Sequence, residues 1–271
     1  MKLAVSNIAW TNEEEPAVAE LLKKLGVQYI EIAPTKKWED PTLTSSKDIE
    51  TYKAFWEFYG IQVVAFQSML FNRPALKLFE NEENRQATLE YLRKFIRLAD
   101  DFGAGVMVFG SPKNRQRHEL PIADAEKIAI PFFDQLGQVA QAHNTVFCIE
   151  PNAPQYDCDF ITDAQSGISI VRSVNNPGFG LHLDIACMTL AGDNVGQSIH
   201  DAEHVLRHFH ISAPYLGQVE DRADVDYQGS AQALRDINYE GYVSIEMRPE
   251  GDNNIERVER AVQFAQRVYK V

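Results

Sequence analysis

Four side chains able to bind metals or move protons stand at the ends of four expected strands in the second half of the chain. Glu150 follows the apolar run VFCI, Asp184 ends FGLHLD, His210 lies in HFHIS and Glu246 ends YVSIE. About one strand–helix unit separates each from the next. In a parallel barrel the C-terminal strand ends meet at one mouth, so these four side chains are expected to converge. Three carboxylates and one imidazole suit a single divalent ion such as Mn²⁺, Mg²⁺ or Co²⁺, with Zn²⁺ also able to bind.

The two glutamates of this set are the expected catalytic residues. Glu150 and Glu246 end the fifth and eighth expected strands, so they can face each other across a substrate bound at the mouth. One glutamate would remove a proton from the carbon beside a carbonyl and the other would return it, while a bound ion stabilises the enediolate. This chemistry predicts an isomerase or epimerase of sugars or related keto-polyols.

Strand-like and helix-like runs alternate along the chain, which is typical of parallel βαβ units. The expected strands cover residues 2–10, 27–34, 61–69, 105–112, 145–152, 178–188, 208–214 and 242–247. The expected helices, with apolar residues at three- and four-residue spacing, are Pro16–Leu25, Ile49–Tyr59, Glu83–Phe102, Ala125–His143, Ala164–Val174, Gly196–Leu206, Ser230–Ile237 and Ile255–Val268. Gly26, Gly60 and Gly103 follow three of these helices, as glycines at helix C-termini do.

The predicted fold class is α/β, a single (β/α)8 TIM barrel over residues 1–271. An open doubly wound sheet could also hold eight units, but no G-x-G-x-x-G follows the first strand, and polar residues end many strands instead of marking one switch point. No linker or low-complexity tract divides the chain, so one domain is expected.

Composition narrows the functional classes. The formal net charge of −13 offers no basic surface for a phosphate backbone, so no nucleic-acid partner is expected. No segment has the length of a membrane span or the pattern of a signal peptide. Cys148, Cys158 and Cys187 show no C-x-x-C spacing, which favours a reducing, cytoplasmic setting over a disulfide scaffold. The expected partner is a small-molecule carbohydrate substrate, and a homo-oligomer is compatible with the sequence.

The motifs IEPN, HLD, HFH and SIE, in this order on the last four strands, resemble the xylose isomerase-like barrel superfamily. The likeness is to its sugar isomerase/epimerase branch, which contains ketose 3-epimerases and hydroxypyruvate isomerases, and FGSPKNR after the fourth strand also matches that branch in style. The resemblance implies that Glu150, Asp184, His210 and Glu246 bind one divalent metal. It also implies that the two glutamates act as acid and base.

Two positions depart from the ketose 3-epimerase pattern. Cys187 stands where those enzymes place a substrate-binding His, and Leu216 stands where they place an Arg. The substrate is therefore expected to be a modified keto-sugar: acidic, phosphorylated or glycosidic. Lys113, Arg115 and Arg248, in loops near the mouth, are the candidates to hold an anionic group.

Further residues are candidates for the substrate pocket. His182 lies two positions before Asp184 and so points to the same side of its strand. It is a candidate to contact substrate or to form a hydrogen bond inside the barrel that supports the metal ligands, and direct binding of the ion is the alternative. Cys187 is expected to line the pocket. Glu31, in YIEIAP, and Gln67, at the end of the third strand, are further pocket candidates; an internal ion pair is the alternative for Glu31.

Other functions remain open at this level. An inosose dehydratase-like lyase would use the same proton abstraction but expel a hydroxyl group. An endonuclease IV-like repair enzyme is disfavoured because that branch uses more histidine ligands, including the His of a D-x-x-H motif, and this chain has Cys187 three residues after Asp184. A sugar-binding barrel without catalysis would not require both glutamates.

Overall fold

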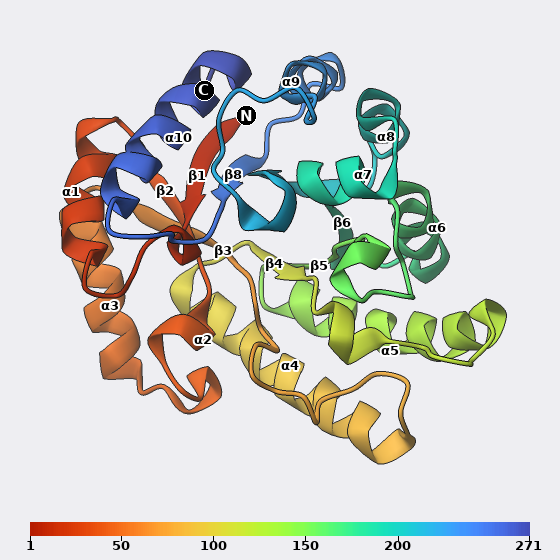
Figure 1. Ribbon diagram of the computed structural model, residues 1–271. Coiled ribbons are helices and arrows are strands. Elements are labelled where there is room, and N and C mark those ends of the chain that lie inside the picture. The colour runs from red at the N-terminus through yellow and green to blue at the C-terminus, as the bar shows by residue number, and fades with distance from the viewer.

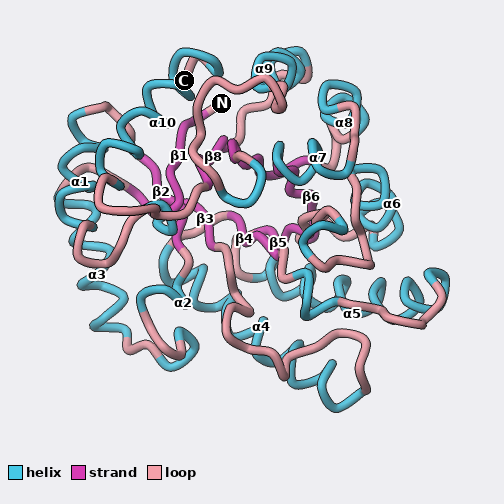
Figure 2. The backbone as a smooth tube through the Cα atoms, viewed as in Figure 1, coloured by secondary structure: helices cyan, strands magenta, loops and turns pink.

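The computed structural model describes residues 1–271, and its eight strands form a closed parallel barrel in the order β1 to β8. Figures 1 and 2 look along the barrel, with the strands in the centre and the helices around them. The strands are β1 Lys2–Ser6, β2 Tyr29–Ile32, β3 Gln62–Phe66, β4 Val106–Phe109, β5 Val146–Ile149, β6 Phe179–Asp184, β7 Leu206–Ser212 and β8 Tyr242–Glu246. Pairing of β1 with β8 closes the ring. The prediction of a (β/α)8 barrel is confirmed.

Ten α-helices connect the strands. They are α1 Glu15–Lys24, α2 Pro34–Lys37, α3 Ser46–Phe58, α4 Glu82–Phe102, α5 Ile122–Ala142, α6 Ala164–Val174, α7 Ile185–Ala191, α8 Val195–Asp201, α9 Tyr227–Asp236 and α10 Asn254–Tyr269. Gly103 ends α4 with a φ of 77°, and Gly26 and Gly60 have φ values of 76° and 75° just after α1 and α3. These glycines end helices as the sequence predicted. No helix is both long enough and apolar enough to cross a membrane.

Several predicted element boundaries differ from the structure, and three of them differ by four residues or more. The first strand ends at Ser6 and not at residue 10, because Asn7–Ala9 turn into a 3₁₀ helix. The sixth strand ends at Asp184, whose carboxylate accepts a hydrogen bond from the Cys187 backbone N–H at 2.6 Å and so begins α7. The helix expected to reach residue 206 stops at Asp201, because Leu206 already belongs to β7.

The barrel encloses one apolar and one polar group of buried side chains. The apolar cluster consists of Ala4, Val64, Ala65, Val106, Val108 and Cys148, of which Val108 also lines the cavity at the mouth. The polar group consists of Glu31, Gln67, His182, His208 and His210. Alternation along each strand brings these residues to the inner face. The apolar core between barrel and helices is a separate, much larger cluster.

Register shifts occur beside two of these inward-facing polar residues. The pairing of β2 with β3 shifts between Ile30 and Glu31, and that of β6 with β7 shifts between Leu181 and His182. Irregularities of this kind re-aim side chains and are common beside functional sites. After the second shift, His182 lies opposite His208, and Asp184 lies opposite His210.

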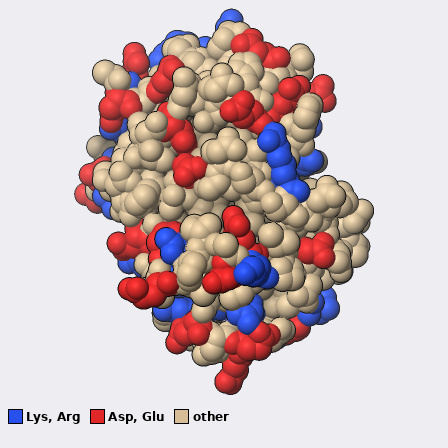
Figure 3. Space-filling view, turned by 90° about the vertical axis from the view of Figure 1, so that its right-hand side faces the viewer, with Lys and Arg blue, Asp and Glu red and all other residues tan.

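The surface seen from the side of the barrel carries both signs of charge. Figure 3 shows acidic and basic side chains interspersed over this face, with no continuous basic area on it. This distribution agrees with the excess of 39 acidic over 26 basic residues.

Candidate metal centre and active site

The four side chains predicted at the strand ends meet at the C-terminal mouth of the barrel. Asp184 and Glu246 end β6 and β8, His210 lies in β7, and Glu150 directly follows β5. His210 Nδ1 lies 3.4 Å from Glu246 Oε2 and 3.8 Å from Asp184 Oδ2. One donor atom each of Glu150, Asp184, His210 and His182 lies within 4.8 Å of the other three. The arrangement brings together donors that the sequence separates by whole βα units.

The orientation of the His210 ring fits a metal ligand. Its Nε2 lies 2.9 Å from Glu31 Oε2, whereas its Nδ1 is buried without a hydrogen-bond partner and faces the carboxylates of Asp184 and Glu246. Ligating histidines usually donate their other ring N–H to a carboxylate, which fixes the ring and the tautomer. Glu31 therefore lies beneath the site as the partner of His210 and His208, which agrees with the internal ion pair given as its alternative role, and it is not among the residues that line the cavity.

Ser212, which was not among the predicted site residues, orients Asp184. Its hydroxyl donates to Asp184 Oδ2 at 2.5 Å and accepts a hydrogen bond from the Ala186 backbone N–H at 3.2 Å. Ser212 lies two residues after His210 on the same strand, so its inward direction could have been inferred from alternation.

The electrostatics of the cluster favour a bound cation. Burial raises the pKa of Glu150 to about 8, and the nearby carboxylates of Glu246 and Asp184 add to this shift. Burial, together with the Glu246 carboxylate, also raises the pKa of Asp184. Burial alone would lower the pKa of His210, but the carboxylates of Glu31 and Glu246 outweigh it and raise that pKa well above its usual value. A divalent ion would relieve the repulsion among the carboxylates.

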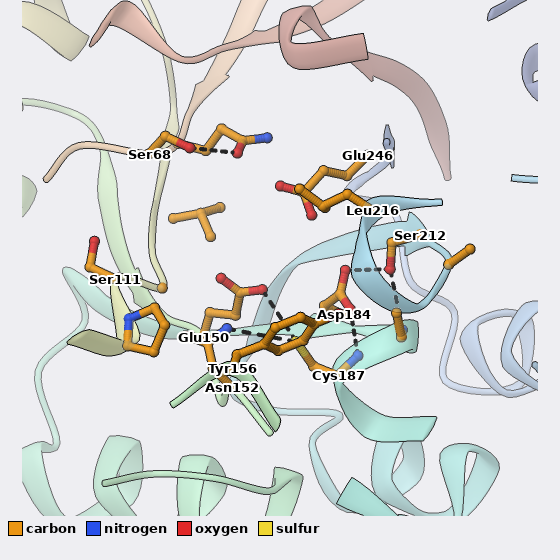
Figure 4. Close-up of a pocket in the computed structure, with 16 residues that line it drawn as sticks. Ser68, Ser111, Glu150, Asn152, Tyr156, Asp184, Cys187, Ser212, Leu216 and Glu246 are labelled. Carbon is orange, nitrogen blue, oxygen red and sulfur yellow. Dashed lines mark hydrogen bonds between the residues drawn. The ribbon is translucent and has the colours of Figure 1, made fainter. Parts of the chain in front are cut away.

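A cavity of about 260 Å³ opens above this cluster. Figure 4 shows Glu150 and Glu246 entering it from different sides, with Asp184 to the right of Glu150 and below Glu246. The other lining residues are Gln67, Ser68, Val108, Gly110, Ser111, Pro112, Asn152, Tyr156, Ala186, Cys187, Ser212, Ala213 and Leu216. This volume lies just below the range of roughly 300–1,000 Å³ for small-molecule pockets, and so favours a small substrate.

Cys187 and Gln67 line this cavity, as predicted, and so does Leu216, the second of the two departures noted in the sequence. Cys187 Sγ lies 3.9 Å from Glu150 Oε1, and burial raises the pKa of its thiol well above the usual value, so the group is a neutral thiol and not a nucleophilic thiolate. Gln67 donates from Nε2 to Ser6 Oγ at 2.7 Å, which holds its amide at the edge of the cavity.

Arg115 does not reach the cavity. Its guanidinium is fully buried and donates to the backbone oxygens of Gly110, Phe160, Ile161 and Glu150 and to Asn152 Oδ1. The expectation that it holds an anionic substrate is therefore not supported, because no donor remains free. Arg115 instead connects the end of β4 to the segment that carries Glu150.

The other two predicted cations also lie outside the cavity. Arg248 is exposed, and its backbone N–H donates to Leu216 O at 2.9 Å. Lys113 is exposed and forms an ion pair with Asp157 at 3.3 Å. It lines an adjoining groove of about 460 Å³, which shares Ser68, Ser111 and Pro112 with the cavity. No lysine or arginine lines the inner cavity itself.

The chain belongs to the xylose isomerase-like TIM barrel family, whose model matches residues 19–268. Two curated proteins that carry the provisional name hydroxypyruvate isomerase are similar over shorter segments. The protein of Xenopus laevis is 27% identical over 100 residues, and that of Mus musculus is 28% identical over 122 residues. These matches cover 36% and 43% of this chain, and 35% and 43% of the relatives.

Solved structures share the fold over nearly the whole chain. A D-psicose 3-epimerase of Clostridium cellulolyticum superposes with a TM-score of 0.80 at 18% identity, covering 99% of both chains. A 3-keto-D-glucoside 4-epimerase of E. coli gives 0.80 at 20% identity, covering 98% of this chain and 99% of the other. The IolI protein, solved with a bound zinc atom, gives 0.77 at 21% identity, covering 100% and 98%.

Proposed function

We propose that this chain is a metal-dependent isomerase or epimerase of small keto-sugars, with Glu150 and Glu246 as its acid–base pair. The observation that carries the proposal is the position of the two carboxylates. They enter one cavity from β5 and β8, above a cluster of Asp184 and His210 that suits a divalent ion. The isomerase and epimerase names among the relatives and structural neighbours support the same class of reaction.

The chain's own residues can hold the ion and move the proton. Glu150, Asp184, His210 and Glu246 would hold it, and Glu31 and Ser212 fix the directions of His210 and Asp184. The bound ion would supply positive charge beside the substrate oxygen that becomes negative when the C–H proton leaves. One glutamate accepts this proton from one face of the carbon chain, and the other can deliver a proton from the opposite face.

Two outcomes follow from the same pair of glutamates. Return of the proton to the same carbon on the opposite face inverts that carbon and gives epimerisation. Return to the neighbouring carbon, together with transfer of the hydroxyl proton from one substrate oxygen to the other, interconverts aldose and ketose. In both outcomes Glu150 and Glu246 are the groups that carry the carbon-bound proton.

The lining of the two cavities favours a neutral substrate that carries an appended group. The inner cavity offers no lysine or arginine to a phosphate or carboxylate. In the adjoining groove, Lys113 is paired with Asp157, and Arg73 donates to the backbone oxygens of Glu39 and Asn72. The exposed ring of Phe71 also lines this groove and offers a face for an appended sugar or apolar group. We therefore favour a keto-glycoside over a sugar phosphate.

Turnover in D₂O tests the proposal. Metal-loaded protein is incubated with a panel of ketoses and keto-glycosides, and NMR follows product and deuterium at the reacting carbon. We expect Glu150→Gln and Glu246→Gln each to lower kcat by at least about 10²–10⁴-fold, because each removes a proton-transfer group. The control is Glu240→Gln, which changes an exposed glutamate just before β8. Full activity of both active-site variants, or a need for a nicotinamide cofactor, would refute the mechanism.

A further inference from the structure

His182 is a fully buried histidine with no hydrogen bond to either ring nitrogen. It lies on β6, two residues before Asp184 and directly after the register shift with β7. Buried polar groups without partners cost free energy and are rare in native proteins. A buried imidazole without partners, beside a cluster of carboxylates, points to a bound group that would occupy one ring nitrogen.

The position of the ring indicates that this group is a metal ion. His182 Nε2 lies 3.9 Å from Glu150 Oε1, and its donor atom lies within 4.8 Å of those of Asp184 and His210. Two ligands held at about 2.1 Å from one ion lie at most about 4.2 Å apart. The 3.9 Å between His182 and Glu150 is within this limit, and the 4.8 Å bound for Asp184 and His210 exceeds it by at most about 0.6 Å, so His182 is close enough to share one ion with these residues.

His208 lies in the same layer but is placed differently. Its Nε2 contacts Glu31 Oε2 at 3.2 Å, and its donor atoms come together only with those of the other two histidines and not with Glu150 or Asp184. His208 therefore provides a matched comparison: a buried histidine on the adjacent strand that cannot reach the carboxylate cluster.

We propose that His182 is an additional protein ligand of the ion, an inference that rests on the proposed metal centre. His182 then adds a second imidazole to the cluster of Glu150, Asp184 and His210, and Glu246 approaches this cluster with Oε2 3.4 Å from His210 Nδ1. Imidazole ligands favour Zn²⁺, Co²⁺ and Fe²⁺, whereas a set made only of oxygens suits Mg²⁺ and Mn²⁺. The site therefore prefers borderline ions over Mg²⁺.

Calorimetric titration of metal-stripped protein with Co²⁺, Zn²⁺, Mn²⁺ and Mg²⁺ tests this assignment. In His182→Gln and His182→Leu we expect the affinity for Co²⁺ and Zn²⁺ to fall by at least about tenfold, with a much smaller change for Mg²⁺, because a nitrogen ligand is lost. The visible spectrum of bound Co²⁺ should change in both variants. His208→Gln should keep the Co²⁺ spectrum of the unaltered protein.

X-ray absorption of the zinc-loaded, unaltered protein gives a readout that does not depend on the folding of a variant. Two imidazoles in the zinc shell would support the proposal, and a single one would overturn it. Wild-type Co²⁺ affinity and spectrum in the folded His182 variants would also overturn it. A different result would refute the metal centre itself. If Glu150→Gln and Asp184→Asn bind these ions as tightly as the unaltered protein, the proposed function fails together with the assignment of His182, whereas unchanged binding in the His182 variants alone overturns only that assignment.

Discussion

Two residues that do not touch the centre of the cluster fix the position of Glu150. Gly110, after β4, leaves the space that the carboxylate occupies, because a Cβ at Gly110 would stand 2.3 Å from Glu150 Oε2. Arg115 holds the backbone of the same residue through a hydrogen bond of 2.6 Å to Glu150 O. The position of the expected base therefore depends on a small residue and a buried cation from the preceding βα unit.

Replacing Gly110 by Ala should displace the Glu150 carboxylate. A displacement of about 1 Å at a reacting group can lower the rate by about 10²-fold. We expect kcat/KM to fall by roughly 10–100-fold, while the cooperative unfolding transition is retained. The control is Gly105→Ala, since a Cβ at Gly105, just before β4, meets nothing within 4 Å. Equal activity of the two variants would show that the exact place of this carboxylate is unimportant.

At the scale of elements, loops after the strands decide what the cavity contacts. In the segment between β7 and α9, Tyr215 and Leu216 both have positive φ values, 62° and 58°. Such backbone conformations are strained for residues other than glycine and are found at functional sites. The Tyr215 backbone N–H donates to Tyr156 Oη at 2.8 Å, and Leu216 O accepts from the Arg248 backbone N–H. These two hydrogen bonds hold both residues of the turn in place, and Leu216 lines the cavity.

The segment between β3 and α4 should decide how an appended group is bound. Phe71 is 60% exposed and lines the groove that joins the cavity. We expect Phe71→Ala to raise KM for a keto-glycoside several-fold while leaving KM for a free ketose unchanged, because only the larger substrate extends over the ring. The comparison is Phe58→Ala, which removes an exposed ring from α3. An equal change for both substrates would rule out a separate subsite.

At the scale of the whole molecule, Glu150 at the barrel mouth makes the stability of the metal-free protein depend on pH. The pKa of Glu150 is about 8 in the folded chain, against an ordinary value of 4.5. Between these two values the folded protein retains a proton that the unfolded chain has released. The contribution of Glu150 to the stability of the metal-free protein therefore falls as pH rises from about 4.5 to 8.

A bound ion should reverse this loss, since it replaces the proton on Glu150. We expect the increase in Tm caused by Co²⁺ or Mn²⁺ to be several degrees larger at pH 8 than at pH 6. The displaced proton contributes up to about 1.4 kcal/mol for each pH unit. Thermal unfolding with and without the ion at pH 6, 7 and 8 measures the effect, with a chelator as the control. A shift that is constant or larger at pH 6 would contradict this linkage.

The sequence by itself determined the barrel and the residues that meet at its mouth. The spacing of apolar residues and the glycines that follow helix C-termini are local properties of the sequence, and they are sufficient to predict eight βα units. The polar ends of the last four strands then predict the convergence of Glu150, Asp184, His210 and Glu246, because parallel strands in a barrel have one common C-terminal face.

Only the tertiary structure decided the surroundings of these residues. Arg115 looked like a loop cation free to bind substrate, yet its partners include the backbone oxygens of Phe160 and Ile161, 45 and 46 residues away. The directions of the Glu31 and His182 side chains follow register shifts in the pairing of neighbouring strands, which lie directly before these two residues. Contacts of this range depend on how whole loops and strands pack against one another, and no local pattern of residues encodes that packing.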